Sequence, residues 1–234
     1  TVYLATLFAG GIIVPIDYGL HEAEIENLLN AAKPLFFFVD EEKYKYFAEN
    51  TCGAQIYSLS PKYPDVYAYA LETSVESQFV SVTEEDVAAI LFTSGTTGTP
   101  KGVMLTHKNF VSDCYIAQTN LEIFPTDVFY ALLPIHHSYT MLAVFIESIS
   151  VGAEIVFAKS MAVSRMLKEL REGKITMLLG VPLLFNKLLA GILKGIRDKG
   201  IVFYGIMKFL MGVSKKKKKI FGINPGKKIF KAVL

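Results

Sequence analysis

Residues 90–107 read ILFTSGTTGTPKGVMLTH, and this stretch decides how the rest of the chain is interpreted. Its two inner glycines, Gly95 and Gly98, have no Cβ, so the backbone can turn sharply and bring its N–H groups close to an anion. Lys101 adds a mobile positive charge of the kind that binds terminal phosphates. Hydroxyl donors surround the glycines, namely Thr93, Ser94, Thr96, Thr97 and Thr99. The stretch therefore predicts a phosphate-binding loop.

Three other kinds of loop share part of this composition. A glycine- and threonine-rich surface connection is common between strands, and it stays open as an alternative. The P-loop of ATPases needs a glycine five residues after its first glycine, where Pro100 stands here. The dinucleotide fingerprint G-x-G-x-x-G also fails, because Thr96 and Thr97 follow Gly95. The spacing thus excludes two commoner nucleotide-binding loops.

Residues 93–102, TSGTTGTPKG, resemble the signature loop of the adenylate-forming (AMP-binding) superfamily at every position. That superfamily includes acyl-CoA synthetases, firefly luciferase and the adenylation domains of peptide synthetases. The resemblance implies that ATP activates a carboxylate to an acyl-adenylate, that pyrophosphate leaves, and that the acyl group then passes to a thiol such as CoA. It also implies Mg²⁺ bridging the phosphate oxygens.

The composition is typical of a globular chain and not of a disordered one. The chain has 234 residues, of which 52% are hydrophobic and 20% charged, enough to bury a sizeable core. Its net charge of +2 gives no reason to expect a nucleic-acid partner. Cys52 and Cys114 lie far apart, so we expect neither a disulfide framework nor a cysteine metal site, and a cytoplasmic location.

The first 16 residues are apolar and uncharged. They lack the basic start of a signal peptide and are shorter than the roughly 20 residues of a spanning helix. We expect a buried helix followed by a strand. Adenylate-forming enzymes carry a similar stretch inside their large domain, so the resemblance implies that this sequence begins partway through that domain.

Hydrophobic periodicity predicts helices alternating with strands, which is typical of an α/β fold with a largely parallel sheet. Residues 35–39, LFFFV, predict a strand buried on both faces. Further strands are expected over residues 54–59, 87–92, 102–105, 127–134, 153–158 and 175–179, and helices over residues 21–32, 41–50, 106–121, 141–150, 162–172 and 180–193. In the helix over 106–121, one buried side is predicted to hold Phe110, Val111, Cys114, Ala117 and Leu121. The resemblance makes this fold an incomplete N-terminal domain without the C-terminal lid domain.

Residues 60–81 have no sustained period and contain two prolines, so they predict a long connection. We expect a subdomain boundary there. Residues 1–82 would form a first α/β subdomain of the AMP-binding domain, and residues 83–234 would carry the phosphate loop and the acyl pocket.

Two adjacent histidines, His136 and His137, follow the strand predicted over residues 127–134. Ligands bind at the carboxyl ends of strands in α/β sheets, although a histidine pair can equally be hydrogen-bonded packing. The segment LPIHHSY resembles the second core motif of the superfamily, and the spacing from Pro134 selects His137 as its motif residue. The resemblance implies that His137 lies beside the acyl carboxylate and the adenylate, and that Tyr139 borders the acyl tunnel. No metal site is expected, because adjacent histidines point differently and no carboxylate lies at ligand spacing.

The segment that starts at Ile201 and ends at Lys219 is apolar over 13 residues and then has five consecutive lysines. Lysine runs are usually solvated. The alternative hypothesis is a peripheral membrane contact, with apolar residues in the interface and lysines on anionic lipid. A segment of this length after the helix expected over residues 180–193 resembles the insertion that long-chain fatty acyl-CoA synthetases have there.

Other superfamily motifs do not occur in these 234 residues, including the Tyr-Gly-x-Thr-Glu segment, the ribose-binding aspartate motif and the catalytic lysine of the lid. We therefore expect a fragment of an acid–thiol ligase that activates a long-chain fatty carboxylate and is inactive alone. A noncatalytic nucleotide-binding derivative and a membrane-associating module of the same fold stay open as alternatives.

Overall fold

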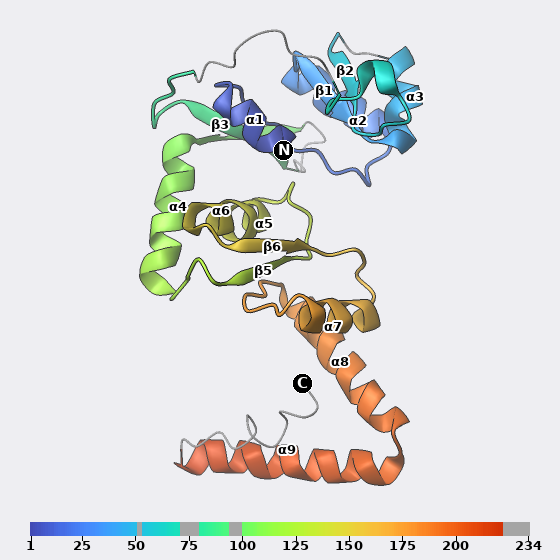
Figure 1. Ribbon diagram of the computed structural model, residues 1–234, viewed down its shortest axis with the longest axis vertical. Helices are drawn as coiled ribbons and strands as arrows, with labels where there is room; N and C mark the ends of the chain where they lie inside the picture. Colours follow the sequence, from blue (N-terminus) through green and yellow to red (C-terminus); the bar gives the residue numbers. More distant parts are fainter. Residues whose placement is uncertain (51–52, 71–79, 94–99, 222–234) are drawn as a thin grey trace.

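A computed structural model describes residues 1–50, 53–70, 80–93 and 100–221, with side chains described as far as Lys215. Short strands alternate with helices, and the described strands form three hydrogen-bonded pairs (Figure 1). Two of these pairs are parallel and one is antiparallel. The α/β class expected from the sequence is confirmed.

The first pair belongs to a compact unit of α2 (Glu22–Ala32), β1 (Phe36–Val39), α3 (Glu41–Glu49), β2 (Gln55–Ser58) and the 3-10 turn η1 (Pro64–Val66). His21 and Glu24 form a capping box at the start of α2, and Lys33 ends the helix in a left-handed conformation just before Pro34. β1 and β2 run parallel, with Phe36 opposite Gln55. The core of this unit consists of Ile25, Leu29, Val39 and Phe47.

The prediction that residues 35–39 are buried on both faces is wrong. Phe37 packs with α2 and α3, but Leu35 is 79% exposed and Phe36 is also exposed. Phe38 stacks on Tyr57 of β2 on the opposite side of the strand. Among the described residues the two helices cover one face of β1 only, so the other face keeps solvent contact.

The second pair is an antiparallel hairpin of β3 (Val87–Thr93) and β4 (Lys101–Thr106). Ahead of β3, Asp86 accepts hydrogen bonds from the backbone N–H and the hydroxyl of Thr83, which closes a turn there. Thr106 then caps α4 (His107–Asn120) through a capping box with Asn109. The hairpin therefore leads directly into a helix.

The start of the chain packs on this hairpin. In α1 (Val2–Phe8), Tyr3 is buried against Ala88, Phe110 and Phe145, and its hydroxyl donates to the sulfur of Met141. Downstream of α1, Ile13 forms a parallel bridge to β3: its N–H donates to the carbonyl of Ala88, and its carbonyl accepts from Ile90. The helix expected here is present, whereas the expected strand is reduced to this single bridge.

The buried side of α4 differs from the one that the sequence predicted for residues 106–121. Phe110 and Cys114 are buried, and Ala117 is half-buried, but Val111 and Leu121 are exposed. The buried stripe of α4 is therefore narrower than the sequence predicted, because η2 (Met141–Ile146) and α6 (Glu147–Val151) cover only the side that holds Phe110 and Cys114.

The third pair is β5 (Val128–Ala131) and β6 (Glu154–Phe157), which run parallel. The crossover between them contains α5 (Ser138–Thr140), the π-helical segment η2 and α6. Strand β5 ends three residues earlier than expected, and the strand expected over residues 175–179 is a single parallel bridge between Phe129 and Met177.

Three helices complete the described chain: α7 (Val163–Glu172), α8 (Pro182–Asp198) and α9 (Ile201–Phe221). Pro182 stands at the first turn of α8, and the helix runs five residues beyond its expected end. Leu184 and Leu188 of α8 pack with Met166 of α7 and Tyr130 of β5. Figure 1 shows α8 leading away from β5 and β6, with α9 lying across its far end.

Candidate functional site

The base of the predicted phosphate loop is held by the β3–β4 hairpin. Thr93 ends β3, Lys101 begins β4, and the two residues are paired across the hairpin. The Thr93 hydroxyl donates to the backbone carbonyl of Lys101 over 3.4 Å, and both residues are exposed. Ser94, Gly95, Thr96, Thr97 and Gly98 lie outside the described residues. Thr93 and Lys101 thus fix where the loop leaves and rejoins the fold.

The histidine pair follows β5, as the sequence indicated. Phe129, Tyr130 and Ala131 are buried, and the chain then turns into the short helix α5, for which His137 is the N-cap residue. The His137 carbonyl accepts from the N–H of Met141, and the His137 side chain is exposed. Burial of β5 therefore presents His137 at the carboxyl end of a core strand.

The two imidazoles contact each other. Nε2 of His136 and Nε2 of His137 are 3.2 Å apart, and the ring centroids are 4.2 Å apart. One proton shared between two nitrogens makes one ring the donor and the other the acceptor. A donating His136 leaves the proton of a neutral His137 on Nδ1, which becomes a donor for another group.

Asp17 approaches the same nitrogen of His136 that contacts His137. Its Oδ2 is 3.6 Å from Nε2 of His136, whose side chain is only 12% exposed. Burial lowers the pKa of His136, the Asp17 carboxylate opposes this by raising it, and His137 lowers it further. The net shift is downward, which favours the neutral imidazole that can share a hydrogen bond with His137.

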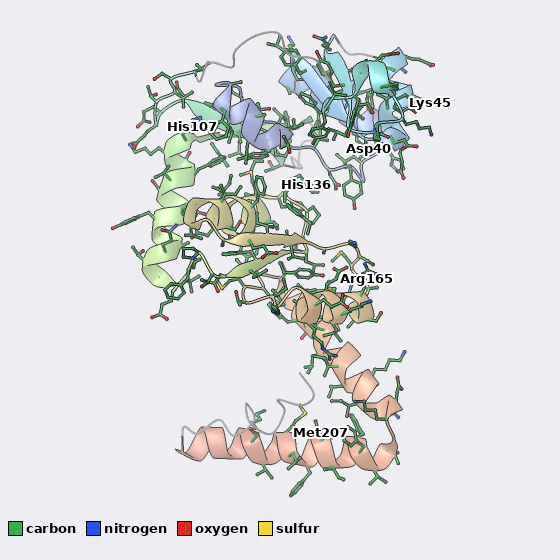
Figure 2. All side chains as sticks on the ribbon, viewed as in Figure 1. Asp40, Lys45, His107, His136, Arg165 and Met207 are labelled. Atoms are coloured by element: carbon green, nitrogen blue, oxygen red, sulfur yellow. The ribbon has the colours of Figure 1, made fainter. Side chains whose placement is uncertain are left out.

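Asp17 links the histidine pair to the hairpin. The bridge at Ile13 runs parallel to β3, and Asp17 follows it in the direction in which β3 leads to Thr93. Parallel chains advance at similar rates, so Asp17 and Thr93 lie toward the same end of these segments. Figure 2 shows His136 between α1 above it and the layer of α5 and β6 below it. The strand direction therefore places the hairpin base and the histidine pair toward the same end of β3.

Tyr139 lies on α5, two residues after His137, and is 49% exposed. Its ring is therefore not part of the buried core and is available to border a bound molecule. Asp17 was missed as a site residue by sequence reasoning. The one signal in the sequence was its position as the first charged residue after an apolar stretch.

Metal ligation by side chains is not evident in this region. Across the described ranges, no group of three or more His, Cys, Asp or Glu side chains is arranged to hold a metal ion.

Comparison with known proteins decides the family. A family model described as "AMP-binding enzyme" matches residues 1–213. The chain belongs to this family. The family recognised from residues 93–102 is confirmed.

Several ligases are relatives of this AMP-binding chain. Peroxisomal long chain acyl-CoA synthetase 7 from Arabidopsis thaliana is 36% identical over 118 residues, covering 50% of the chain and 17% of the relative. A 4-coumarate–CoA ligase from Humulus lupulus is 29% identical over 196 residues, covering 77% and 35%. The chain thus spans less than two fifths of the length of these relatives.

Solved structures agree with the fold. The crystal structure of ATP-bound MatB from Rhodopseudomonas palustris has a TM-score of 0.69 and 29% identity, covering 80% of this chain and 38% of MatB. The MenE structure from Bacillus subtilis in complex with AMP has a TM-score of 0.70 at 24% identity, covering 81% and 47%. The AMP-binding chain therefore has the α/β architecture of the adenylate-forming enzymes.

Proposed function

We propose that this chain carries the pyrophosphate-binding and carboxylate-orienting part of an ATP-dependent acyl-CoA ligase. A carboxylate oxygen of the acid attacks the α-phosphorus of ATP, the bond to the bridging oxygen breaks, and pyrophosphate leaves. The CoA thiol then attacks the acyl carbon of the adenylate, its proton is lost, and AMP leaves with the electron pair. The products are an acyl-CoA thioester, AMP and pyrophosphate.

One observation carries this proposal: the histidine pair lies against Asp17, and Asp17 follows Ile13, which bridges to the β3 strand that leads to the hairpin base at Thr93 and Lys101. Adenylation brings two anions together, a carboxylate and a triphosphate, so donors must neutralise both. A cationic loop beside an imidazole donor meets that need. Positioning of the two reactants then supplies much of the rate.

The residues divide this work. The β- and γ-phosphates are assigned to the loop that begins at Thr93 and rejoins the fold at Lys101, with Ser94, Gly95, Thr96, Thr97 and Gly98 between them. His137 donates from Nδ1 to the acyl carboxylate when its Nε2 accepts from His136. Tyr139, half-exposed on α5, borders the acyl chain.

We propose that Mg²⁺ binds to this chain together with the nucleotide. It neutralises phosphate charge when bound, and it typically keeps several waters and one or two carboxylates besides substrate phosphates. No side-chain cluster of three metal ligands occurs in the described ranges. The part assigned to this chain is therefore to hold phosphate oxygens, which fits a nucleotide-borne ion.

We assign a long-chain fatty acid as the substrate. Support comes from the relatives named as long chain and fatty acyl-CoA synthetases, and from the long segment after residue 182. Because other relatives are named as 4-coumarate and malonate ligases, the test of this assignment compares the three acids. Thermal stabilisation of the chain by palmitate, 4-coumarate and malonate in the presence of an ATP analogue should be greatest for palmitate.

Lys101 provides the sharpest test of nucleotide binding. Replacing Lys101 by Met removes a charge at the loop base, so we expect ATP and pyrophosphate to bind about tenfold more weakly or worse in calorimetric titrations. Lys45→Met on α3 is the control, since this exposed lysine lies away from the hairpin (Figure 2). Equal affinity in Lys101→Met and in Lys45→Met would contradict the phosphate role.

We also propose that these 234 residues do not complete the reaction alone. Incubation with ATP, CoA and palmitate should release no pyrophosphate above background, whereas a longer protein containing the remaining family motifs should. Turnover by the chain itself at the rate of a full-length synthetase would contradict this. ATP binding without adenylate formation in the longer protein would favour the alternative, a noncatalytic nucleotide-binding derivative.

The proposed location is the cytoplasm, with peripheral contact to a membrane through the segment from Ile201 to Lys219. A ligase for fatty acids gains from such contact, because its acyl substrate partitions into lipid. No described helix is long and apolar enough to cross a membrane.

A further inference from the structure

Helix α9 has two apolar faces, and only one of them is covered. Met207 and Ser214 are buried, and Tyr204 lies among Ala190, Leu193 and Arg197 of α8. Val202, Ile206 and Phe209 are 74%, 53% and 70% exposed. Their spacing of i, i+4 and i+7 puts these three side chains on one face of the helix. Among the described elements, α8 makes the substantial contact with α9, so this second face stays open.

The same helix pair is strongly basic. Residues 182–221 contain ten lysines and arginines and one acidic residue, Asp198, while the rest of the chain contains 14 basic and 21 acidic residues. Five of the ten are the consecutive lysines 215–219, near the end of α9, which itself has no acidic residue. The positive charge of the chain is thus concentrated in the segment that forms α8 and α9.

Two lysines of the α8–α9 segment also lie over aromatic rings. The ammonium group of Lys208 is 6.0 Å from the ring centroid of Tyr204, and that of Lys199 is 5.9 Å from the ring centroid of Phe203. Such lysines lay their methylene stems on apolar surface and keep the charge at its edge.

An occupant of this surface must offer hydrocarbon and negative charge together. Antiparallel pairing of two α9 helices would bury Val202, Ile206 and Phe209, but it would bring no carboxylate to the lysines. An anionic bilayer offers acyl chains a few ångströms below a layer of phosphates, which is the environment of interfacial amphipathic helices.

We propose that α9 lies in the interface of an anionic membrane, with Val202, Ile206 and Phe209 inserted and the strongly basic sequence of the α8–α9 segment attracted to the lipid phosphates. The helix binds in the plane of the membrane. This proposal is independent of the ligase reaction, because it needs neither nucleotide nor acid.

Vesicle co-sedimentation of the 234-residue chain tests the charge. The chain should pellet with vesicles of equal parts phosphatidylcholine and phosphatidylglycerol, and not with phosphatidylcholine alone. Each lysine near an anionic surface strengthens membrane binding about fivefold. If only two of the lysines 215–219 reach the surface, replacing all five by Gln should weaken binding about 25-fold, and by more if further lysines reach it. Equal binding of this variant, or of the chain to uncharged vesicles, would overturn the proposal.

A single tryptophan tests the apolar face. The chain has no tryptophan, so Phe209→Trp adds one fluorophore on α9, and Tyr115→Trp adds one on α4 at a residue that is also 70% exposed. Both sites face water, so both variants are expected to keep the fold. We expect a blue shift and quenching by brominated lipid for Phe209→Trp with anionic vesicles, and neither for Tyr115→Trp.

Three results would overturn the proposal that this face of α9 inserts into the membrane. They are an unshifted Phe209→Trp in vesicle-bound protein, an equal shift in both variants, and a shift of Phe209→Trp that grows with protein concentration without vesicles. The last result would assign the face to a second copy, whose acidic remainder would meet the lysines. Circular dichroism of each variant, compared with the unsubstituted chain, separates these results from loss of the fold.

Discussion

At the scale of single residues, the contact between Asp17 and His136 is the feature that sequence analysis did not predict. The spacing from Pro134 was enough to select His137, because the signal lay within a few neighbouring residues. Asp17 belongs to a segment far away in the sequence, and it reaches His136 only because Ile13 pairs beside β3. A pattern read along the chain cannot find a partner that the pairing of separate segments creates.

The pKa of His136 provides a direct test of this contact. An NMR titration should give His136 a pKa below its ordinary value, because burial disfavours the imidazolium. Asp17→Asn should lower the pKa of His136 further, since the carboxylate is the group that raises it, and His137→Gln should shift it upward. A pKa of His136 unchanged by Asp17→Asn would show that the two side chains do not interact in solution.

The lowered pKa of His136 also determines whether the stability of the folded chain rises or falls with pH. A histidine with a lowered pKa in the folded state binds protons more readily when unfolded. Its contribution to stability is therefore present above the unfolded pKa of about 6.5 and is lost as pH falls through the folded value. Unfolding by urea at several pH values should show this loss in the unsubstituted chain and a smaller one in His136→Gln.

At the scale of elements, the packing of α7 on α8 depends on a glycine. A Cβ built on Gly191 would lie 2.3 Å from Cγ1 of Val163 in α7, whereas one on Gly195 would meet nothing within 4 Å. Gly195→Ala should stabilise the chain by up to about 1 kcal/mol through helix propensity. Gly191→Ala should destabilise it by about 1–2 kcal/mol, because the overlap outweighs that gain.

Thermal unfolding of the two glycine variants makes the comparison. Adding Val163→Ala to Gly191→Ala should restore part of the stability by removing the atom that the new methyl group meets. Stabilisation by Gly191→Ala equal to that by Gly195→Ala would show that the two helices can separate at no measurable cost.

A buried carboxylate lies where α6 packs on α4. Glu147 is 1% exposed, and no hydrogen bond from the described residues reaches either oxygen. Its polar neighbour is the Cys114 thiol, whose pKa is raised to about 12 by burial and by this carboxyl. A carboxyl group buried with so few hydrogen-bond partners is costly, so Glu147→Leu should stabilise the chain by about 1–3 kcal/mol. The control, exposed Glu49→Leu at the end of α3, should stay within about 0.5 kcal/mol.

Chemical denaturation measures both glutamate variants. A destabilised Glu147→Leu would mean that the carboxyl group has a structural partner in solution, and Cys114→Ala would then identify it if it removed the same stability. Cys114 should also resist alkylation in the folded chain, because its thiol is buried and stays protonated.

The elements that the sequence predicted wrongly share a physical cause. Periodicity reports which side of an element is apolar, and it correctly predicted α2, α3 and the strands β3 and β4, though not their antiparallel pairing. It does not report whether a neighbour covers that side. Leu35, Val111 and Leu121 are apolar and still exposed, since no described element lies against them. The strand predicted over residues 175–179 likewise needs a partner along its length and finds one only at Phe129.

At the scale of the whole molecule, the subdomains predicted as residues 1–82 and 83–234 remain a prediction, and the contacts make them dependent on each other. Tyr3 is buried in the core that contains Ala88 and Phe110, and Ile13 exchanges hydrogen bonds with β3. The start of the chain therefore packs in the second part. Residues 22–66 form their own core around Leu29 and Phe47.

Cutting the chain between these parts should therefore leave them together. With a site for a sequence-specific protease inserted after Ala70, an exposed residue, cleavage should give two fragments that elute as one species in size-exclusion chromatography. Tyr3→Ala removes a buried ring and its hydrogen bond to Met141, so the cut variant should separate while cut Tyr46→Ala, altered at an exposed ring in the other core unit, should not. Separation of the unsubstituted fragments under native conditions would instead support two independent subdomains.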